Sequence, residues 1–431
     1  MKSIAELKKR FESNKHLRQS VTLMLWNFCS IPLAFVTNIV ITRYMGAQAY
    51  GDYLYIQKVF DFAFIILSFG VLQSVNRAVL LAGDDKSIRE YYGSGLLGLF
   101  LVYVLICLAL VTFTLISPNI REKGLLEIML CVIPFSLIHY AQNYFEQVLP
   151  ASNKITELII QRYIPRVGLF LMSLALYLIV KKINLALNPV IVVWALYLGT
   201  QTIVYLYVLQ RIKPSFANLK SRFKDIIRLD KEFGIQVYFG NLFSTAFTAL
   251  MPIFLSAFGE DNAGVGYYSL SLMLSQPLSF IPIVVATSHY QKFAEYKSIP
   301  RKLITTTFLI SLFAMLCLWV LVTPFINIFY TAEFSPVIYL TIISSIGTLL
   351  YGFSDFFSRY LMSQGKGKAL RNSSFIVGFT TLVLSVVLIP WIHETGASIV
   401  HVGAGLIYFI IILHYYIKCI KENSKDIENN N

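Results

Sequence analysis

Long stretches of apolar residues restrict the fold of this chain more than any other feature of the sequence. Twelve stretches are long enough to cross a membrane: 20–42, 53–75, 93–117, 125–149, 160–180, 188–210, 235–258, 266–290, 303–329, 336–361, 370–391 and 396–417. About 20 helical residues, each rising ~1.5 Å, span the roughly 30 Å hydrocarbon core of a bilayer. The composition agrees, because the chain is 56% hydrophobic and only 14% charged. We therefore expect an all-α polytopic membrane protein with twelve transmembrane helices.

The positions of the basic residues predict the orientation of these helices. If the N-terminus is cytoplasmic, 29 of the 36 Lys and Arg residues fall in inner segments and 5 in outer loops. Cytoplasmic loops of membrane proteins carry such an excess of positive charge. We therefore expect both termini in the cytoplasm. The net charge of +13 is explained by this topology and by attraction to anionic lipid headgroups, so no nucleic-acid partner is expected.

A short motif occurs twice and indicates an internal repeat. The stretch ITRYMGAQAYGDY has a weaker copy, SAFGEDNAGVGYY, in the second half of the chain. Gly46 aligns with Gly259, Gly51 aligns with Gly266, and further matches follow in the same order at a nearly constant offset. We expect the glycines to provide tight turns in the outer loop after the first helix of each half, because glycine tolerates backbone conformations that other residues avoid.

The repeat predicts two homologous lobes of six helices each. Six is an even number, so both lobes begin on the cytoplasmic side and form a parallel repeat. The apolar residues of the linker between them recur at helical spacing, which predicts an amphipathic helix on the inner leaflet. The predicted parts are a cytoplasmic amphipathic N-terminal segment (1–19), an N-lobe (20–210), a basic cytoplasmic linker helix (211–234), a C-lobe (235–417) and a cytoplasmic tail (418–431).

Polar residues inside the predicted spans are candidates for a functional site. A charged group near the centre of a membrane helix costs about 2.5 to 3.5 kcal/mol on insertion scales, so such groups should face a cavity or each other. Lys58 and Asp61 lie on one helix face and could form a self-contained ion pair or act in ion coupling. The fourth span carries a polar stripe that could line a cavity or bond neighbouring helices: His139, Gln142, Asn143 and Glu146.

Four arginines belong to the cytoplasmic side of the predicted spans: Arg77, Arg162, Arg166 and Arg359. They could snorkel to lipid headgroups, or their guanidinium groups could bind phosphate oxygens. Asn27 and Asn241 occupy matching positions in the two halves and, with Gln142 and Asn143, are further substrate-binding candidates. The candidate carriers of a coupled proton or sodium ion are Asp61 with Lys58, Glu146, Asp355 and Glu394.

The sequence lacks the usual signs of catalysis. It has no GxxxxGK[ST] nucleotide-binding loop, no HExxH motif and no Cys/His cluster. We therefore expect no catalytic residues, no metal and no cofactor, apart from the coupling ion.

Several stretches resemble the bacterial polysaccharide repeat-unit flippases, which are the Wzx-type O-antigen and capsule exporters of the multidrug/oligosaccharidyl-lipid/polysaccharide (MOP) superfamily. They are the WN pair in the first span, ITRYMGAQAYGDY, SFGVLQSVNR and YLMSQGKGKALRNSS. The most specific positions are Arg43, Gly46, Tyr50 and Gly51.

This resemblance implies a V-shaped, MATE-like transporter in the bacterial inner membrane. Such a protein moves an undecaprenyl-pyrophosphate-linked oligosaccharide between leaflets by alternating access, and polysaccharide polymerase and chain-length proteins would be its partners. The resemblance also implies a cationic central cavity, for which the four arginines are the candidates.

Three other functions remain as alternatives. Multidrug exporters of the same superfamily use a carboxylate in the first span, but 20–42 contains no Asp or Glu. Lipid II flippases usually have two further helices, for which no apolar stretch remains. A polysaccharide polymerase would show a long outer loop rich in Arg or His, whereas the predicted outer loops are short.

Overall fold

The computed structural model describes residues 15–180 and 187–428; at some helical positions, Asn27 and Asn241 among them, it describes the backbone alone. This part of the chain is helical and contains no strand. The all-α fold is therefore confirmed. Residues 1–14, which hold most of the predicted N-terminal amphipathic segment, lie outside the described residues.

Contacts divide the chain into two compact units. The first consists of Met1–Met45 and Ala63–Phe239, and the second of Gly46–Phe62 and Gly240–Asn431. By these contacts, the start of the second predicted span groups with the C-terminal half of the chain rather than with its own half.

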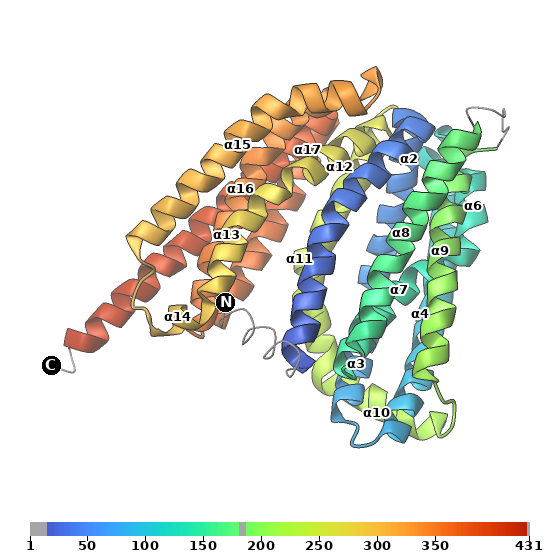
Figure 1. The fold of residues 1–431 in the computed structure, drawn as a ribbon, viewed down its shortest axis with the longest axis horizontal. Coiled ribbons are helices and arrows are strands. Elements are labelled where there is room, and N and C mark those ends of the chain that lie inside the picture. Colours follow the sequence, from blue (N-terminus) through green and yellow to red (C-terminus); the bar gives the residue numbers. More distant parts are fainter. Residues whose placement is uncertain (1–14, 181–186, 429–431) are drawn as a thin grey trace, which may run out of the picture. The chain divides into compact units, whose positions relative to one another are not determined.

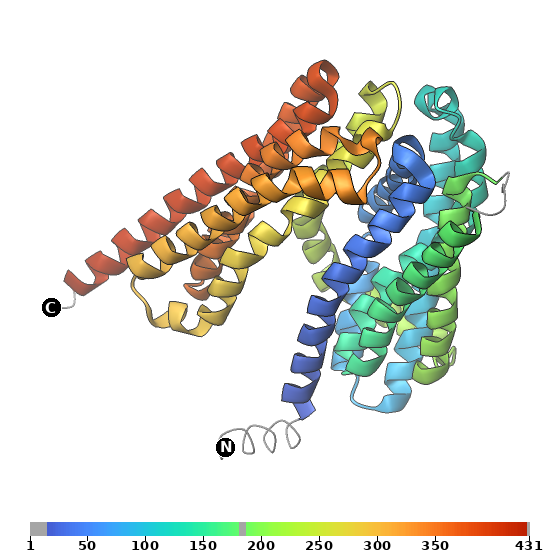
Figure 2. The ribbon, with the colours of Figure 1, turned by 45° about the horizontal axis from the view of Figure 1, so that its top comes forward.

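The first unit is built around α7, which packs against α3, α4, α8 and α9 (Figures 1 and 2). The proline of the turn η1 separates α6 from α7 within one apolar span. Asp84 caps α4 by accepting a hydrogen bond from the Ser87 backbone N–H at 3.2 Å, so α4 begins before its apolar stretch. The elements are α2 (Lys15–Leu67, shared with the second unit), α3 (Val71–Leu81), α4 (Asp85–Ile116), α5 (Pro118–Glu122), α6 (Leu126–Val132), η1 (Ile133–Phe135), α7 (Ser136–Ala151), α8 (Ile155–Val180), α9 (Pro189–Ile212), α10 (Leu219–Leu229) and η2 (Asp230–Gly234).

The second unit is built around α16, which packs against α12, α13, α15 and α17 (Figure 1). Buried serines link three of these helices, because Ser344 bonds both Ser271 at 3.3 Å and Ser398 at 3.1 Å. Small hydroxyl residues allow close approach of membrane helices and bond across them. The elements are α11 (Ile235–Phe258), α12 (Ala263–Ser275), α13 (Pro277–Ser288), α14 (Tyr290–Glu295), α15 (Arg301–Phe329), η3 (Ala332–Phe334), α16 (Pro336–Ser363) and α17 (Gly367–Glu428).

Eight or nine segments of the described chain are long and apolar enough to span a membrane. The number depends on α2 and α3, which are bent by 64° where Phe69 and Gly70 take positive φ angles. Two long helices contain breaks: α2 at Gly46, with φ 75°, and α17 at His393, with φ 42°. The protein is thus a multi-pass membrane protein. The two breaks, together with α11, support the prediction of twelve spans.

The repeated glycines differ from the prediction in their role. Gly46 makes the predicted turn, but Gly51 is helical, and a Cβ atom there would lie 1.8 Å from the Asn262 carbonyl oxygen. A Cβ atom on Gly266 would lie 3.1 Å from the Tyr50 ring and 3.4 Å from the Gly51 nitrogen. At these two positions, therefore, glycine permits close packing of two segments and not a turn.

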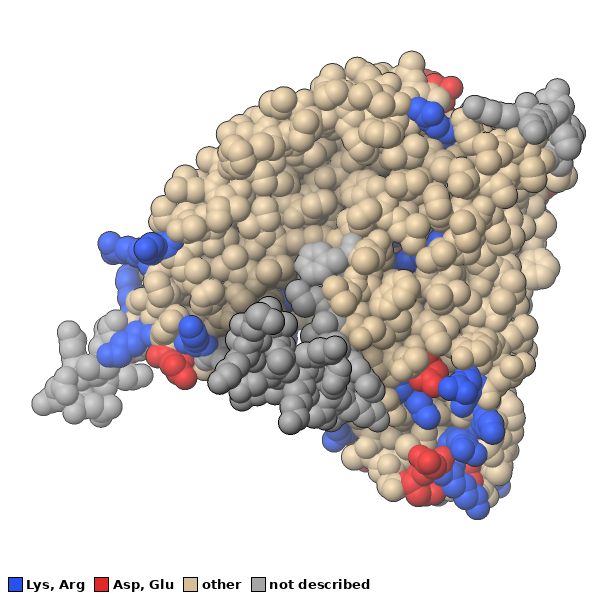
Figure 3. Space-filling view, viewed as in Figure 1, with Lys and Arg blue, Asp and Glu red and all other residues tan. Residues whose placement is uncertain are grey.

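Charged side chains gather at one end of each unit. On the face shown in Figure 3 they lie where α10 ends the first unit and where α14 ends the second, and most of the visible face beyond is uncharged. These are the ends that the positive-inside pattern predicts to be cytoplasmic.

Candidate functional site

The first unit brings three of the predicted polar residues together near the charged end. Gln142 and Glu146 lie one turn apart on α7, and Arg162 reaches them from α8. The Arg162 Nε atom lies 3.4 Å from Glu146 Oε1, and Gln142 Nε2 donates to the same oxygen at 3.4 Å. The Arg162 and Glu146 side chains are 27% and 34% exposed, so solvent or a ligand can reach both. We call Gln142, Glu146 and Arg162 the Arg162 cluster.

Arg166 lies one turn after Arg162 and is exposed. Its guanidinium carbon lies 5.6 Å from the ring centroid of Tyr163, which in turn stacks on Trp26 at 5.6 Å. A cation over an aromatic face is attracted by the ring quadrupole. The α8 helix therefore presents two cationic groups one turn apart beside an aromatic pair.

The other candidates of the first unit lie apart from this cluster or are not described. Arg77 on α3 lies 5.9 Å from the Phe233 ring, and within the described residues no hydrogen bond or ion pair joins it to the Arg162 cluster. Asn143 is exposed on α7. The side chains of Asn27 and Asn241 lie outside the described residues.

His139, from the same polar stripe, is buried in an aromatic group. Its Nδ1 atom lies 3.1 Å from the Tyr197 hydroxyl, and its ring packs edge-on against Trp194. These contacts join α7 to α9. For His139, interhelical bonding is the role that the contacts support.

The second unit holds the remaining charged candidates. Lys58 Nζ and Asp61 Oδ2 form an ion pair at 3.2 Å, as their spacing predicts. The Tyr408 hydroxyl donates to Asp355 at 3.3 Å and lies 3.0 Å from the Ser358 hydroxyl. Arg359 lines a pocket of about 510 Å³ with Thr287, Ser288, Tyr290 and Met362.

Some polar contacts could not be expected from the sequence, because their partners are far apart along the chain. Near the Gly46 break, Glu333 accepts a hydrogen bond from the Ala47 backbone N–H at 3.0 Å. Asn262 donates to Asp52 at 2.7 Å inside the protein. The repeated motif contains Asp52 and Asn262 and is the one signal that could have drawn attention to this pair.

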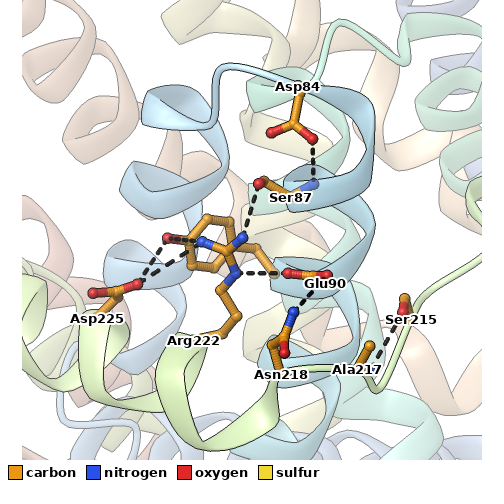
Figure 4. Close-up of polar contacts among 9 residues, drawn as sticks. Asp84, Ser87, Glu90, Ser215, Ala217, Asn218, Arg222 and Asp225 are labelled. Atoms are coloured by element: carbon orange, nitrogen blue, oxygen red, sulfur yellow. Dashed lines mark hydrogen bonds and ion pairs between the residues drawn. The ribbon is translucent and has the colours of Figure 1, made fainter.

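The linker is fixed to the first unit by a buried ion pair (Figure 4). Arg222 of α10 donates from Nε to Glu90 at 2.8 Å, and Asn218 donates to the other oxygen of Glu90 at 3.1 Å. Arg222 also donates to the hydroxyls of Ser87 at 2.8 Å and Tyr91 at 3.2 Å. The Glu90 side chain is 1% exposed. The hydrogen bond to this carboxylate raises the pKa of Arg222, so the guanidinium stays charged.

The predicted linker helix is thus present, but one face of it packs on α3 and α4. Ile226 is buried in this contact, whereas Phe216 and Ile227 remain exposed. Those exposed side chains are available to the bilayer surface.

Two solved structures have the same fold. The lipid II flippase MurJ in an inward-closed conformation has a TM-score of 0.66 and 14% sequence identity, over 93% of this chain and 90% of that chain. An inward-facing MATE multidrug-resistance transporter of the MOP superfamily has a TM-score of 0.61 and 15% identity, over 90% of this chain and 95% of that chain. These likenesses establish a MurJ- and MATE-like fold.

No curated protein matches the sequence. A family model described as "polysaccharide biosynthesis protein" matches residues 16–291, which is more than half of the chain. On this match the chain belongs to the polysaccharide biosynthesis protein family.

Proposed function

We propose that this protein is a flippase that moves an undecaprenyl-pyrophosphate-linked oligosaccharide repeat unit, for O-antigen or capsule, across the bacterial inner membrane. The observation that carries the proposal is a polysaccharide biosynthesis sequence on a MurJ- and MATE-like fold. Pyrophosphate and sugars cannot cross hydrocarbon unaided, whereas a polyprenyl tail can stay in lipid. The protein therefore has to shield only the headgroup.

The Arg162 cluster and Arg166 are the proposed contacts of the pyrophosphate. Guanidinium groups bind phosphate oxygens through paired hydrogen bonds, and two such groups one turn apart suit a diphosphate. The ion pair with Glu146 uses the Nε atom of Arg162. Its terminal amino groups therefore remain for an incoming anion.

Glu146 gives this site a route to ion coupling. A phosphate bound to the terminal amino groups would share the positive charge of Arg162 with Glu146, and a carboxylate whose cation is partly neutralised favours uptake of a proton or a sodium ion. The pairs Lys58–Asp61 and Asp355–Tyr408 are the other proposed coupling positions.

The sugar part of the substrate is proposed to bind polar side chains through its hydroxyls. The candidates are Gln142, Asn143, Asn27 and Asn241. The two halves are proposed to alternate access around the substrate.

A lipid II flippase is the second candidate, because the MurJ structure has this fold. A multidrug exporter is less well supported, because Lys15–Met45 contains no Asp or Glu that could couple transport. Both alternatives predict substrates that differ from a repeat unit.

The test uses a strain that lacks this protein. We expect complete lipid-linked repeat units to accumulate facing the cytoplasm and surface polysaccharide to be lost, with recovery on wild-type complementation. Repeat units accumulating unpolymerised on the outer face would point to a polymerase. Accumulation of lipid II with normal surface polysaccharide would favour the second candidate.

The role of the arginines has its own test. The double variant Arg162→Ala/Arg166→Ala should reach the membrane at wild-type level and fail to restore surface polysaccharide. The matched control is Arg228→Ala on α10, whose side chain is 67% exposed and pairs only with Asp225 at 3.7 Å among the described residues. Normal polysaccharide in the double variant would remove both arginines from the site.

A further inference from the structure

A pocket that contains a charged side chain lies in the second unit. The Arg162 cluster belongs to the first unit, so the two are separate. Its walls come from the end of α13 (Thr287 and Ser288), the start of α14 (Tyr290) and the last turns of α16 (Arg359 and Met362). The pocket has a volume of about 510 Å³, which is room for a headgroup rather than for a few waters.

Arg359 is the charged group of this pocket, and one of its donors has no hydrogen-bond partner. The Nε atom is buried and has no hydrogen-bond partner, and no ion pair engages the side chain within the described residues. Asp355, one turn earlier on α16, attracts this charge electrostatically, but the hydrogen bond that it accepts comes from Tyr408. A buried donor without a partner is costly, and a buried cationic one more so. Because of this cost, the pocket favours an anionic ligand.

The hydroxyls beside Arg359 restrict the ligand further. Thr287 donates to the Ile283 carbonyl at 2.6 Å, and Ser288 donates to the Val285 carbonyl at 2.8 Å. The Thr287 proton is used within the helix, so the Thr287 oxygen can still accept a hydrogen bond, whereas the Ser288 oxygen also lies 3.0 Å from His289 Nδ1. A ligand for this pocket should therefore offer an anion to Arg359 and a hydroxyl donor to Thr287.

The surroundings place this ligand at a membrane surface. Met362 is 52% exposed and gives the pocket an apolar edge. Several basic residues lie at the same end of the unit, at positions that the charge pattern predicts to be cytoplasmic: Lys292, Lys297, Arg301, Lys302 and Lys368. Clustered basic residues at a membrane surface attract anionic headgroups.

We propose that the Arg359 pocket binds the headgroup of a lipid whose phosphate carries a hydroxyl-bearing group, in the cytoplasmic leaflet. Two sources share this chemistry: the sugar pyrophosphate of a polyprenyl-linked substrate, and phosphatidylglycerol. Binding of the first rests on the function proposed above. Binding of the second does not, so the pocket could be occupied even if the protein moved a different cargo.

The test measures lipid binding to the purified full-length protein in detergent, by native mass spectrometry and thermal stability. The probes are phosphatidylglycerol and a polyprenyl pyrophosphate bearing one hexose; phosphatidic acid, which lacks the extra hydroxyls, is the comparison lipid. We expect one of the two hydroxylated lipids to bind, and Arg359→Gln to weaken its binding about tenfold or more, as for loss of a charge-assisted hydrogen bond. Thr287→Val should reduce the preference over phosphatidic acid and leave the affinity for phosphatidic acid unchanged.

Two controls separate this site from general electrostatics and from the proposed transport site. Arg301→Gln removes one charge from an exposed residue at the same end of the unit and should bind lipid as the wild type does. Arg162→Ala/Arg166→Ala should also retain binding at the Arg359 pocket, even if transport is lost. Without lipid, Arg359→Gln should lose little stability, because the lost Nε donor has no hydrogen-bond partner and only the electrostatic attraction to Asp355 is removed.

The outcomes are distinct. Loss of phosphatidylglycerol binding in Arg359→Gln supports a phospholipid site, and loss of the sugar-lipid binding supports a substrate site. Equal binding of both lipids by wild type and Arg359→Gln, or binding by neither protein, would overturn the proposal while leaving the flippase assay in cells unaffected.

Discussion

Replacing Gly51 by alanine should destabilise the protein, although alanine is the better helix former. A Cβ atom at Gly51 would lie 1.8 Å from the Asn262 carbonyl oxygen and 2.4 Å from the Asn262 carbonyl carbon. Carbon and oxygen atoms in contact normally stay about 3.3 to 3.6 Å apart. The backbone around Asn262 would therefore have to move, and both contacting atoms belong to backbone that cannot rotate away.

The expected change in the free energy of unfolding combines two destabilising effects and one stabilising effect. Inserting a methyl group into a packed contact costs about 1 to 3 kcal/mol. Moving Asn262 also strains its buried 2.7 Å hydrogen bond to Asp52, and a bond of this charged kind contributes about 1.5 to 3 kcal/mol. The higher helix propensity of alanine stabilises the helix by about 1 kcal/mol relative to glycine. We expect a net destabilisation of about 3 kcal/mol.

Thermal unfolding of the purified protein in detergent, followed by tryptophan fluorescence, gives the measurement. Gly199→Ala, on helix α9, is the matched control. A Cβ atom at Gly199 would have no neighbouring atom within 4 Å among the described residues, so this substitution should be neutral or stabilising. Gly266→Ala should fall between the two, because its closest contact, at 3.1 Å, is with the Tyr50 side chain. A Gly51→Ala protein as stable as the wild type, beside a neutral Gly199→Ala, would refute the close contact.

Three further outcomes are expected. Glu333→Ala removes the acceptor of the Ala47 N–H at the start of the helix after Gly46, and should lower stability by about 1 kcal/mol in the same thermal assay. Arg222→Ala leaves the Glu90 carboxylate buried without its cation and should lower the free energy of unfolding by about 3 to 5 kcal/mol. The double variant Glu90→Gln/Arg222→Ala should recover part of this stability. An equal loss of stability in the single and the double variant would show that the two residues are not coupled. Asp355→Asn should insert into the membrane at wild-type level, but its transport should no longer depend on a proton or sodium gradient. Transport assays in membrane vesicles measure this dependence. A dependence equal to that of the wild type would exclude Asp355 as the ion carrier.

The sequence predicts those features that depend on neighbouring residues. Apolar length predicts membrane helices, and the glycine in ITRYMG predicts the break at Gly46. Spacing on one helix predicts the Lys58–Asp61 pair. Each of these depends on residues within one continuous stretch of sequence, for which local geometry is nearly fixed.

Contacts between distant segments could not be predicted in the same way. The partners Glu90 and Arg222, and likewise Asp52 and Asn262, meet only after the chain has folded. For the same reason the sequence alone suggests a turn at Gly51, since only the tertiary structure shows the Asn262 backbone beside it. Of the candidate site, the sequence shows the spacing of Gln142 and Glu146 and the presence of Arg162, but not that Arg162 pairs with Glu146.

The contact between Gly51 and Gly266 has an evolutionary consequence. The sequence repeat treats these two residues as the same position in two copies, and the folded chain puts them next to each other. If the repeat arose by duplication of one six-helix unit, a single glycine codon in an ancestral homodimer would have supplied both sides of a symmetric contact, and any larger residue would have clashed twice. After fusion of the two copies, each side could vary separately. A bulkier residue on one side could then be accepted if the other side gave way, which predicts compensating changes between the two halves among relatives.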